Sequence, residues 1–292
     1  MAMSGQQAKQ QPKSQLGMVQ DHAPGTGIAM AELSAIIFDV DGTLADTERN
    51  GHLVAYNRTF ADFDLPWRWT EDQYRDLLEI TGGSERLRHF LSHQQTDLKL
   101  NADQLEDMVR SLHQAKNQHY RELLHCDAVP LRPGVKRLIQ ESREAGIRLA
   151  IATASQLCNV YTLIEHNLGT DAINWFEIIV GGDSVAAKKP APDVYQRVIA
   201  ELRLPCNQVL AVEDSAQGLQ AALGTGIRTL VTTNHFTEQQ DFDGAVAVVN
   251  HLGEPDCPFE SRNDDISGDV VNLAMLRSFG FDNSVNFTKH SA

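Results

Sequence analysis

The sequence of 292 residues lacks a long apolar run and has few cysteines. A helix that crosses a membrane needs about 18 or more consecutive apolar residues, and no stretch approaches that length. The cysteines lie far apart and form no CxxC pair, which argues against a zinc site or a disulfide framework; they are Cys126, Cys158, Cys206 and Cys257. We therefore expect free thiols in a reducing compartment, which predicts a cytoplasmic protein.

Basic residues are in the minority. The chain has 25 lysines and arginines against 39 aspartates and glutamates, which gives a formal net charge of −14. A surface of that sign repels nucleic acids and anionic membranes, so we expect neither as a partner. Hydrophobic residues make up 42% of the chain, which suffices for a packed core and excludes global disorder.

The first 29 residues contain few large apolar side chains, no apolar stretch of the signal-peptide kind and no arginine. These absences argue against a secretory signal and against a mitochondrial transit peptide. We expect residues 1–29 to form a disordered leader and the globular part to begin near residue 30.

Short runs rich in β-branched residues recur along the rest of the chain, as is typical of strands buried on both faces. The predicted strands are residues 35–40, 147–152, 176–180, 209–212, 228–231 and 245–249. Apolar residues at helical spacing lie between them at residues 135–142, 194–202 and 216–223. This alternation predicts an α/β fold with a doubly wound, mostly parallel, Rossmann-like sheet.

One segment interrupts the alternation. Residues 49–124 contain no convincing strand, and their apolar side chains follow helical spacing, which predicts an inserted all-helical cap over the sheet. The catalytic core would then comprise residues 30–48 and 125–252. The tail at 253–292 is polar, although residues 270–276 fit one or two helical turns against the core.

The strongest chemical signal is the pair Asp39 and Asp41, which follows the first predicted strand. Residues two apart in an extended segment point to the same side, so both carboxylates face one site with room for one transferred group. The first carboxylate can attack as a nucleophile and the second can move a proton. Gly42 allows the sharp turn that follows. The alternative is an ordinary turn cluster, because Asp-Gly is common in turns.

Glu213 and Asp214 follow the predicted strand 209–212 and add carboxylates at the same edge of the sheet. Several acids in one place repel one another unless a cation lies among them, and hard oxygen ligands near a phosphate favour Mg²⁺. The alternative is a helix N-cap at residues 214–215, and the two roles are compatible.

Two further strand ends carry phosphate-binding chemistry. Thr153 ends the predicted strand 147–152, where its hydroxyl and the free amides that follow can bind a phosphoryl oxygen. Lys189, before Pro190, can bridge the nucleophile and a phosphate. The alternative for Lys189 is an ordinary solvated lysine, and that is our interpretation of Lys188. All four signals fall at carboxyl ends of predicted strands.

These motifs resemble those of the haloacid dehalogenase-like hydrolases over roughly residues 33–250. Residues 39–48 (DVDGTLADTE), Thr153, Lys189 and the pair Glu213-Asp214 match the four motifs of that superfamily in order, and the helical insert resembles its C1-type cap. The resemblance implies that Asp39 forms an aspartyl-phosphate, while Asp41 acts as acid and base. It also implies that Mg²⁺ is held by Asp39, the Asp41 carbonyl and Asp214, with Glu213 close by, and that Thr153 and Lys189 hold the phosphoryl oxygens.

Within the superfamily the chain resembles the CbbY-type sugar-phosphate phosphatases, through residues 81–86 (TGGSER), 131–134, 187–193 and 213–215. The best-known substrate of that group is xylulose 1,5-bisphosphate. The likeness implies a substrate-binding set of Glu48, His52, Thr81, Gly82, Gly83, Arg86 and Ala154. Arg86 would anchor a second phosphate, while Glu48 and His52 would line the sugar pocket. The alternative for both Arg86 and His52 is a position on a helix surface.

A Mg²⁺-dependent phosphatase acting on a small phosphorylated metabolite is therefore the leading hypothesis. Asp41 argues against a dehalogenase, and the absence of lysine from residues 49–98 argues against a phosphonatase-like enzyme. Three alternatives stay open: a phosphomutase of the β-phosphoglucomutase type, a phosphoglycolate phosphatase, and a catalytically silent binding module with the same fold.

Overall fold

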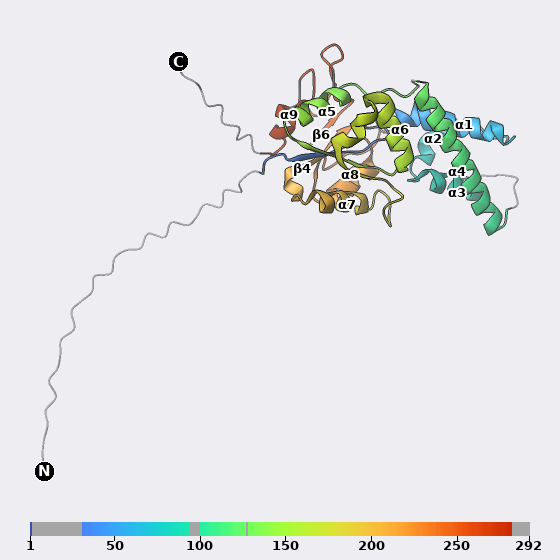
Figure 1. Ribbon diagram of the computed structural model, residues 1–292, viewed down its shortest axis with the longest axis horizontal. Helices are drawn as coiled ribbons and strands as arrows, with labels where there is room; N and C mark the ends of the chain where they lie inside the picture. The colour runs from blue at the N-terminus through green and yellow to red at the C-terminus, as the bar shows by residue number, and fades with distance from the viewer. Residues whose placement is uncertain (2–30, 94–99, 127, 282–292) are drawn as a thin grey trace.

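Figure 1 shows the computed structural model, which describes residue 1 and residues 31–93, 100–126 and 128–281. The predicted leader lies almost entirely outside the described residues, as does the end of the predicted tail. All four cysteines are free thiols, as the sequence predicted. Over the described ranges, no helix combines the length and the apolar character needed to span a bilayer.

The centre of the molecule is one six-stranded parallel sheet, which confirms the predicted α/β class. Its strands are β1 (Ala35–Phe38), β2 (Arg148–Ala152), β3 (Phe176–Val180), β4 (Val209–Glu213), β5 (Arg228–Thr232) and β6 (Ala247–Val249). They lie in the order β3-β2-β1-β4-β5-β6, and every pairing is parallel. This doubly wound order places β1 between β2 and β4, so polar residues that follow these three strands meet at one edge.

Helices cover both faces of the sheet, which explains the continuous apolar runs of its strands. Ile36 and Phe38 of β1 belong to one core cluster with residues of α5 (Val135–Glu144) and α6 (Leu157–Leu168). Ala35 and Ile37 face the other side, toward α7 (Asp193–Leu202) and α8 (Ala216–Leu223). In Figure 1, α5 lies above the sheet and α7 below it. Helix α6 was not predicted from the sequence.

The segment between β1 and α5 is helical and lies at one end of the molecule, on the right in Figure 1. It comprises the π-helical turn Glu48–His52 and the helices α1 (Leu53–Asp62), α2 (Glu71–Leu77), α3 (Gly83–His93) and α4 (Ala102–His125). These helices enclose a second apolar cluster, rich in aromatic rings such as Tyr56, Trp69 and Phe90. The helical content agrees with the predicted cap, while the boundaries at residues 48 and 125 remain a prediction.

The chain beyond residue 252 contributes to the core, in part through a helix that overlaps the turns predicted at residues 270–276. Helix α9 (Leu273–Ser278) begins at the N-cap Asn272, whose side chain accepts from the Met275 amide at 2.9 Å. Leu273, Leu276 and Phe281 are buried in the same cluster as β1 and α5. Part of the predicted tail therefore packs against the sheet region and belongs to its core.

Candidate active site

A cavity of about 260 Å³ lies where the helical segment meets the carboxyl ends of β1, β2 and β4. It is lined by every predicted site residue except Glu213: Asp39, Asp41, Glu48, His52, Thr81, Gly82, Gly83, Arg86, Thr153, Ala154, Lys189 and Asp214. The structure therefore brings the residues predicted at the strand ends together with those expected from the helical segment.

Lys189 connects the Asp39 carboxylate to Glu213. Its Nζ lies 2.6 Å from Asp39 Oδ1, 2.6 Å from Glu213 Oε1 and 2.9 Å from the Ala152 carbonyl. The side chain is buried, so the solvated alternative is wrong. Burial opposes a charge on Lys189, but the two carboxylates outweigh it and hold the pKa of Lys189 above its usual value. Lys189 is therefore a fixed cation beside the Asp39 carboxylate.

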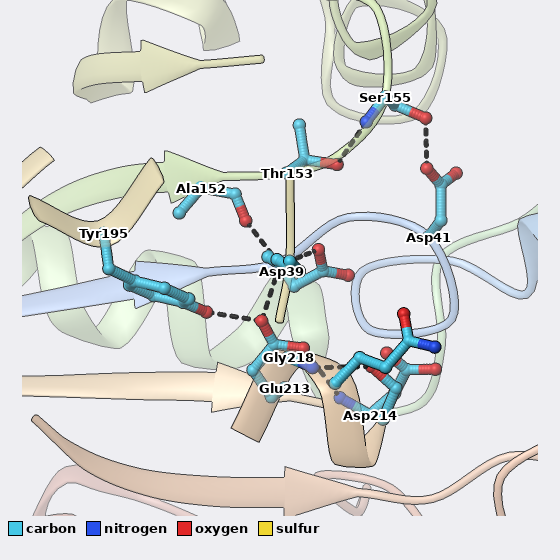
Figure 2. Close-up of polar contacts among 12 residues, drawn as sticks. Asp39, Asp41, Ala152, Thr153, Ser155, Tyr195, Glu213, Asp214 and Gly218 are labelled. Carbon is cyan, nitrogen blue, oxygen red and sulfur yellow. Dashed lines mark hydrogen bonds and ion pairs between the residues drawn. The ribbon is translucent and has the colours of Figure 1, made fainter. Parts of the chain in front are cut away.

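Glu213 is fully buried behind the cavity wall and orients Lys189. The Tyr195 hydroxyl also donates to Glu213 Oε1, as Figure 2 shows. Helix α8 passes so close that a Cβ at Gly218 would overlap the Glu213 carboxylate, so only glycine fits there. The metal-ligand role predicted for Glu213 stays a prediction, since one of its oxygens already accepts from two donors.

Three buried carboxylates can hold a cation. Asp39, Glu213 and Asp214 each offer an oxygen, and these oxygens lie within 4.8 Å of one another. Burial, and then repulsion between these carboxylates, raises the pKa of Asp39 well above its usual value and that of Asp214 to about 8. A bound divalent cation would relieve this repulsion, and an all-oxygen donor set suits a hard ion. The residues therefore fit the Mg²⁺ site that the sequence predicted.

Asp41 points away from this carboxylate group, toward Ser155 (Figure 2). Its Oδ1 accepts from the Thr47 hydroxyl at 2.6 Å and lies 3.1 Å from His52 Nε2, while its Oδ2 accepts from the Ser155 hydroxyl. Burial raises the pKa of Asp41, but His52 and these hydrogen bonds outweigh it and hold the pKa well below its usual value. Asp41 is therefore ionised and held apart from the Asp39 carboxylate.

His52 is buried in the π-helical turn that leaves the sheet, so the alternative of a surface position is wrong. Its ring lies 4.1 Å from the ring of Tyr120 on α4, measured between centroids. A π-helical turn adds a residue to the helix and often occurs at functional sites. Here the turn places His52 beside the Asp41 carboxylate, and it places Glu48 in the wall of the cavity.

Thr153 and its neighbours form the β2 side of the cavity. The Thr153 hydroxyl accepts from the Ser155 amide at 3.1 Å, which fixes the turn after β2 (Figure 2). Ala154 lines the cavity between them. The hydrogen bond from Ser155 to Asp41 was not predicted, although the motif Thr-Ala-Ser carries the hydroxyl that makes it.

Arg86 lies on the opposite wall and is buried, so its alternative as a surface charge is also wrong. It donates from Nε to the Leu77 carbonyl at 3.0 Å and from Nη1 to the Tyr74 hydroxyl at 3.0 Å. Tyr74 in turn donates to Glu48 Oε2 at 2.5 Å. Arg86 is therefore anchored within the helical segment and presents a positioned positive charge to the cavity.

Lys116 lines the cavity from α4 and was not predicted as a site residue. Its Nζ lies 5.1 Å from the ring centroid of Tyr56 and 5.5 Å from that of Tyr120. Burial lowers the pKa of Lys116 to about 8. The signal was available: Lys116 follows Leu112 by four residues and precedes Tyr120 by four, so it lies on the apolar face of a long helix.

Lys188 is not the solvated lysine that the sequence suggested. Its side chain is 25% exposed, and its Nζ lies 2.7 Å from Glu85 Oε1 on α3. The Thr81 hydroxyl similarly donates to Gln217 on α8, and Gln217 Nε2 donates to the Glu79 carbonyl at 2.8 Å. These contacts join the loop before α7 and helix α8 to the helical segment, which closes one side of the cavity.

The family model described as haloacid dehalogenase-like hydrolase matches residues 36–232. The chain belongs to the haloacid dehalogenase-like hydrolases. The four predicted motifs of this hydrolase lie within the matched range and meet at one edge of the sheet.

The hydrolase is similar to CbbY proteins. It is 41% identical over 247 residues to plasmid protein CbbY from Cupriavidus necator, a match that covers 85% of this chain and 96% of the relative. A crystal structure of CbbY from Rhodobacter sphaeroides in complex with phosphate superposes with a TM-score of 0.70 at 41% identity, covering 75% of this chain and 94% of that one. A mutant of the same protein in complex with xylulose 1,5-bisphosphate gives a TM-score of 0.69 at the same identity and coverage.

Proposed function

We propose that this hydrolase is a Mg²⁺-dependent phosphatase of the CbbY type, which removes phosphate from a small phosphorylated sugar such as xylulose 1,5-bisphosphate. The observation that carries the proposal is the pair of separately held carboxylates in one cavity. Asp39 is held by the cation Lys189, while Asp41 is held by His52 and Ser155. The solved complex of a 41% identical relative with xylulose 1,5-bisphosphate supports the substrate class.

The two carboxylates can divide the chemistry. Lys189 occupies Asp39 Oδ1, which leaves Oδ2 to attack phosphorus and form an aspartyl-phosphate. Asp41 then has to protonate the leaving oxygen and later take a proton from water. Asp41 is ionised without substrate, and an incoming phosphate dianion raises the pKa of a neighbouring carboxylate, which favours uptake of the proton that the leaving group needs.

The remaining residues would bind and orient the substrate. Lys189 and the Thr153 turn would hold the oxygens of the transferred phosphoryl group. Mg²⁺ would be held by the carboxylates of Asp39 and Asp214 and the Asp41 carbonyl, where it supplies positive charge beside the phosphate. On the opposite wall, Arg86 and Lys116 offer positive charge for a second phosphate. Two anion sites in one cavity favour a bisphosphate over a phosphate with a single charged end.

The helices of residues 49–124 are the cap in this proposal, and their closure excludes water from the cavity. The contacts of Lys188 with Glu85 and of Gln217 with Thr81 belong to the closed arrangement. A cytoplasmic location, predicted from cysteine use, is also part of the proposal and is supported by the four free thiols.

Phosphate release from xylulose 1,5-bisphosphate tests the proposal, with Mg²⁺ and with a chelator, on the natural chain and on Asp39→Asn. We expect Mg²⁺-dependent release by the natural chain and none by the variant, because an amide cannot form the acyl-phosphate. Phosphorus NMR with glucose 1-phosphate and a bisphosphate primer tests the mutase alternative. Glucose 6-phosphate as the main product would overturn the phosphatase proposal, and no turnover of any phosphate ester would favour a silent binding module.

A further inference from the structure

The loop that follows β5 touches both the carboxylate group and the helical cap. At its start, Asn234 donates from Nδ2 to Asp214 Oδ2 at 2.7 Å and lies 3.4 Å from the Gly42 carbonyl. The packing here is tight, because a Cβ at Gly42 would overlap both the Asp214 carboxylate and the Asn234 amide. Asn234 therefore fixes one oxygen of the carboxylate that is proposed to bind the cation.

Two residues later, the same loop enters the cap. Phe236 is buried in the apolar cluster of the cap, and every other buried member of that cluster comes from residues 53–112. Its ring meets the ring of Tyr74 edge-on at 5.7 Å between centroids, and the Arg75 guanidinium lies 5.8 Å from its centroid. Phe236 is therefore a side chain of the sheet region that completes the core of the cap.

The two contacts are joined through a single side-chain amide. Asn234 Oδ1 accepts from the Phe236 backbone amide at 2.9 Å, while Nδ2 of the same amide donates to Asp214. The turn is closed by hydrogen bonds from the Asn234 amide to the Thr237 hydroxyl at 3.0 Å and from the Thr237 amide to the Asn234 carbonyl at 3.1 Å. A displacement of Phe236 therefore moves the group that orients Asp214.

We propose that Asn234 and Phe236 are positioning residues that couple the docked cap to cation binding at Asp214. When the cap encloses Phe236, the Asn234 amide is held against the carboxylate in one orientation. By thermodynamic reciprocity, cation binding then favours the docked cap to the same extent that docking favours the cation. The inference rests on the proposed function, since it takes Asp214 as a cation ligand, and it adds that the cap regulates that ligand before any substrate binds.

Calorimetric titration of Mg²⁺ into substrate-free protein tests the coupling, because it measures affinity without turnover. Changing a partner that orients a metal ligand lowers metal affinity by about 10- to 100-fold, so we expect about tenfold weaker binding for Asn234→Ala. For Phe236→Ala we expect the dissociation constant to rise about three- to tenfold. Phe242→Ala is the matched control: Phe242 is a buried phenylalanine of the same loop, but it packs against Leu219 and Val248.

Thermal unfolding without Mg²⁺ separates coupling from simple loss of packing. We expect both phenylalanine variants to unfold at lower temperature and only Phe236→Ala to bind Mg²⁺ more weakly. Equal Mg²⁺ affinity in Phe236→Ala and the natural chain would overturn the proposal, as would an equal loss of affinity in Phe242→Ala.

A pair of cap variants decides the question if Phe236→Ala does not fold. Arg75→Ala removes a cap contact to Phe236 and His235 without changing the loop, and we expect it to weaken Mg²⁺ binding about twofold or more. Arg88→Ala removes a cap arginine that pairs with Glu106 within the cap and should leave the affinity unchanged. Equal affinity in both variants would overturn the coupling.

Asp214→Asn separates this inference from the proposed function. If Asp214→Asn abolishes Mg²⁺ binding while Phe236→Ala and Arg75→Ala leave it unchanged, the coupling fails and the metal site stands. If Asp214→Asn binds Mg²⁺ as well as the natural chain does, the metal site of the proposed function fails and the coupling fails with it.

Discussion

At the scale of single residues, the site depends on how each charge is held. Two adjacent lysines show this well, because Lys189 lies between two buried carboxylates whereas Lys188 pairs with Glu85 of the cap. In the proposed mechanism, the fixed cation beside Asp39 would stabilise the charge of the transition state, whereas the ion pair between Lys188 and Glu85 would act on closure of the cap. The same chemical group therefore has two different roles at neighbouring positions.

Substitution of the two lysines separates these roles. We expect Lys189→Ala to lower kcat by about 10²- to 10³-fold, as for other preorganised charge contacts. Lys188→Ala should lower kcat/KM by less than about tenfold, because a partly exposed ion pair contributes little. Steady-state kinetics of phosphate release measure both. A Lys189→Ala enzyme that keeps a third or more of the activity would show that this lysine does not contact the reacting group.

We expect Lys116 to give the site a pH dependence. Burial lowers the pKa of Lys116 to about 8, so the ammonium is charged below that pH and neutral above it. Attraction for a second phosphate is therefore present at about pH 7 and is lost as the pH rises through about 8. We expect kcat/KM for a bisphosphate to fall over that range, as measured by pH profiles of phosphate release.

Lys116→Met provides the control for that profile. The variant should turn over a bisphosphate poorly at every pH and lack the decline near pH 8, while an aryl phosphate with a single charged group should show little change. A decline of the same size in Lys116→Met would assign the pH dependence to another group.

At the scale of helices and strands, much of the fold could be predicted from the sequence. Parallel strands covered on both faces are continuous apolar runs, so the ends of β1 to β6 were all predicted to within two residues. Helix α6 was missed even though Val160, Leu163 and Ile164 have helical spacing. The helical turns predicted at residues 270–276 overlap α9 and pack against the core, whereas the burial of Phe281 was not predicted.

The site was predictable where a residue follows a strand, since strand order alone brings such residues to one edge. In the cap, the motif at residues 81–86 pointed to residues that line the cavity, but cap residues outside a motif depend on contacts between segments far apart in the chain. Lys116 was hidden in an amphipathic helix, and Phe236 in a loop whose partner is the cap. Whether Arg86 and His52 are exposed or buried likewise depends on how the cap packs, and the sequence alone did not show that packing.

Helix α9 should stabilise the sheet region without taking part in catalysis. Leu276 is fully buried in the main core, so Leu276→Ala should lower the free energy of unfolding by about 2–4 kcal/mol. Leu223→Ala is the control, because that leucine at the end of α8 is 38% exposed and should cost under about 1 kcal/mol. Denaturant unfolding measures both, and a Leu276→Ala protein as stable as the control would show that α9 is not part of the core.

At the scale of the whole molecule, the crowded carboxylates make stability depend on pH and on the cation. The pKa of Asp214 is about 8 in the folded chain against 3.8 for an ordinary aspartate, and that of Asp39 is raised too. The folded state therefore binds more protons than the unfolded state between about pH 4 and pH 8. Without a cation, this contribution to stability is complete below about pH 4 and is lost as the pH rises through about 8.

Metal-free protein should accordingly unfold more easily at about pH 8 than at about pH 6, and Mg²⁺ should raise its stability most at the higher pH. Asp214→Asn should reduce both effects, because the neutral amide removes one titrating group and one cation ligand. Thermal unfolding with Mg²⁺ and with a chelator measures them. A natural chain whose unfolding temperature is insensitive to Mg²⁺ at both pH values would contradict this account of the carboxylate group.

The central claim is that Asp39 attacks the substrate from a site assembled at one edge of the sheet. Rapid acid quenching of a single turnover of the bisphosphate, followed by mass spectrometry of the digested protein, tests it most directly. The account predicts a transient phosphoryl group on the peptide that contains Asp39, and none in Asp39→Asn. Turnover with the phosphoryl group on another residue, or with no phosphorylated protein at any time, would contradict it.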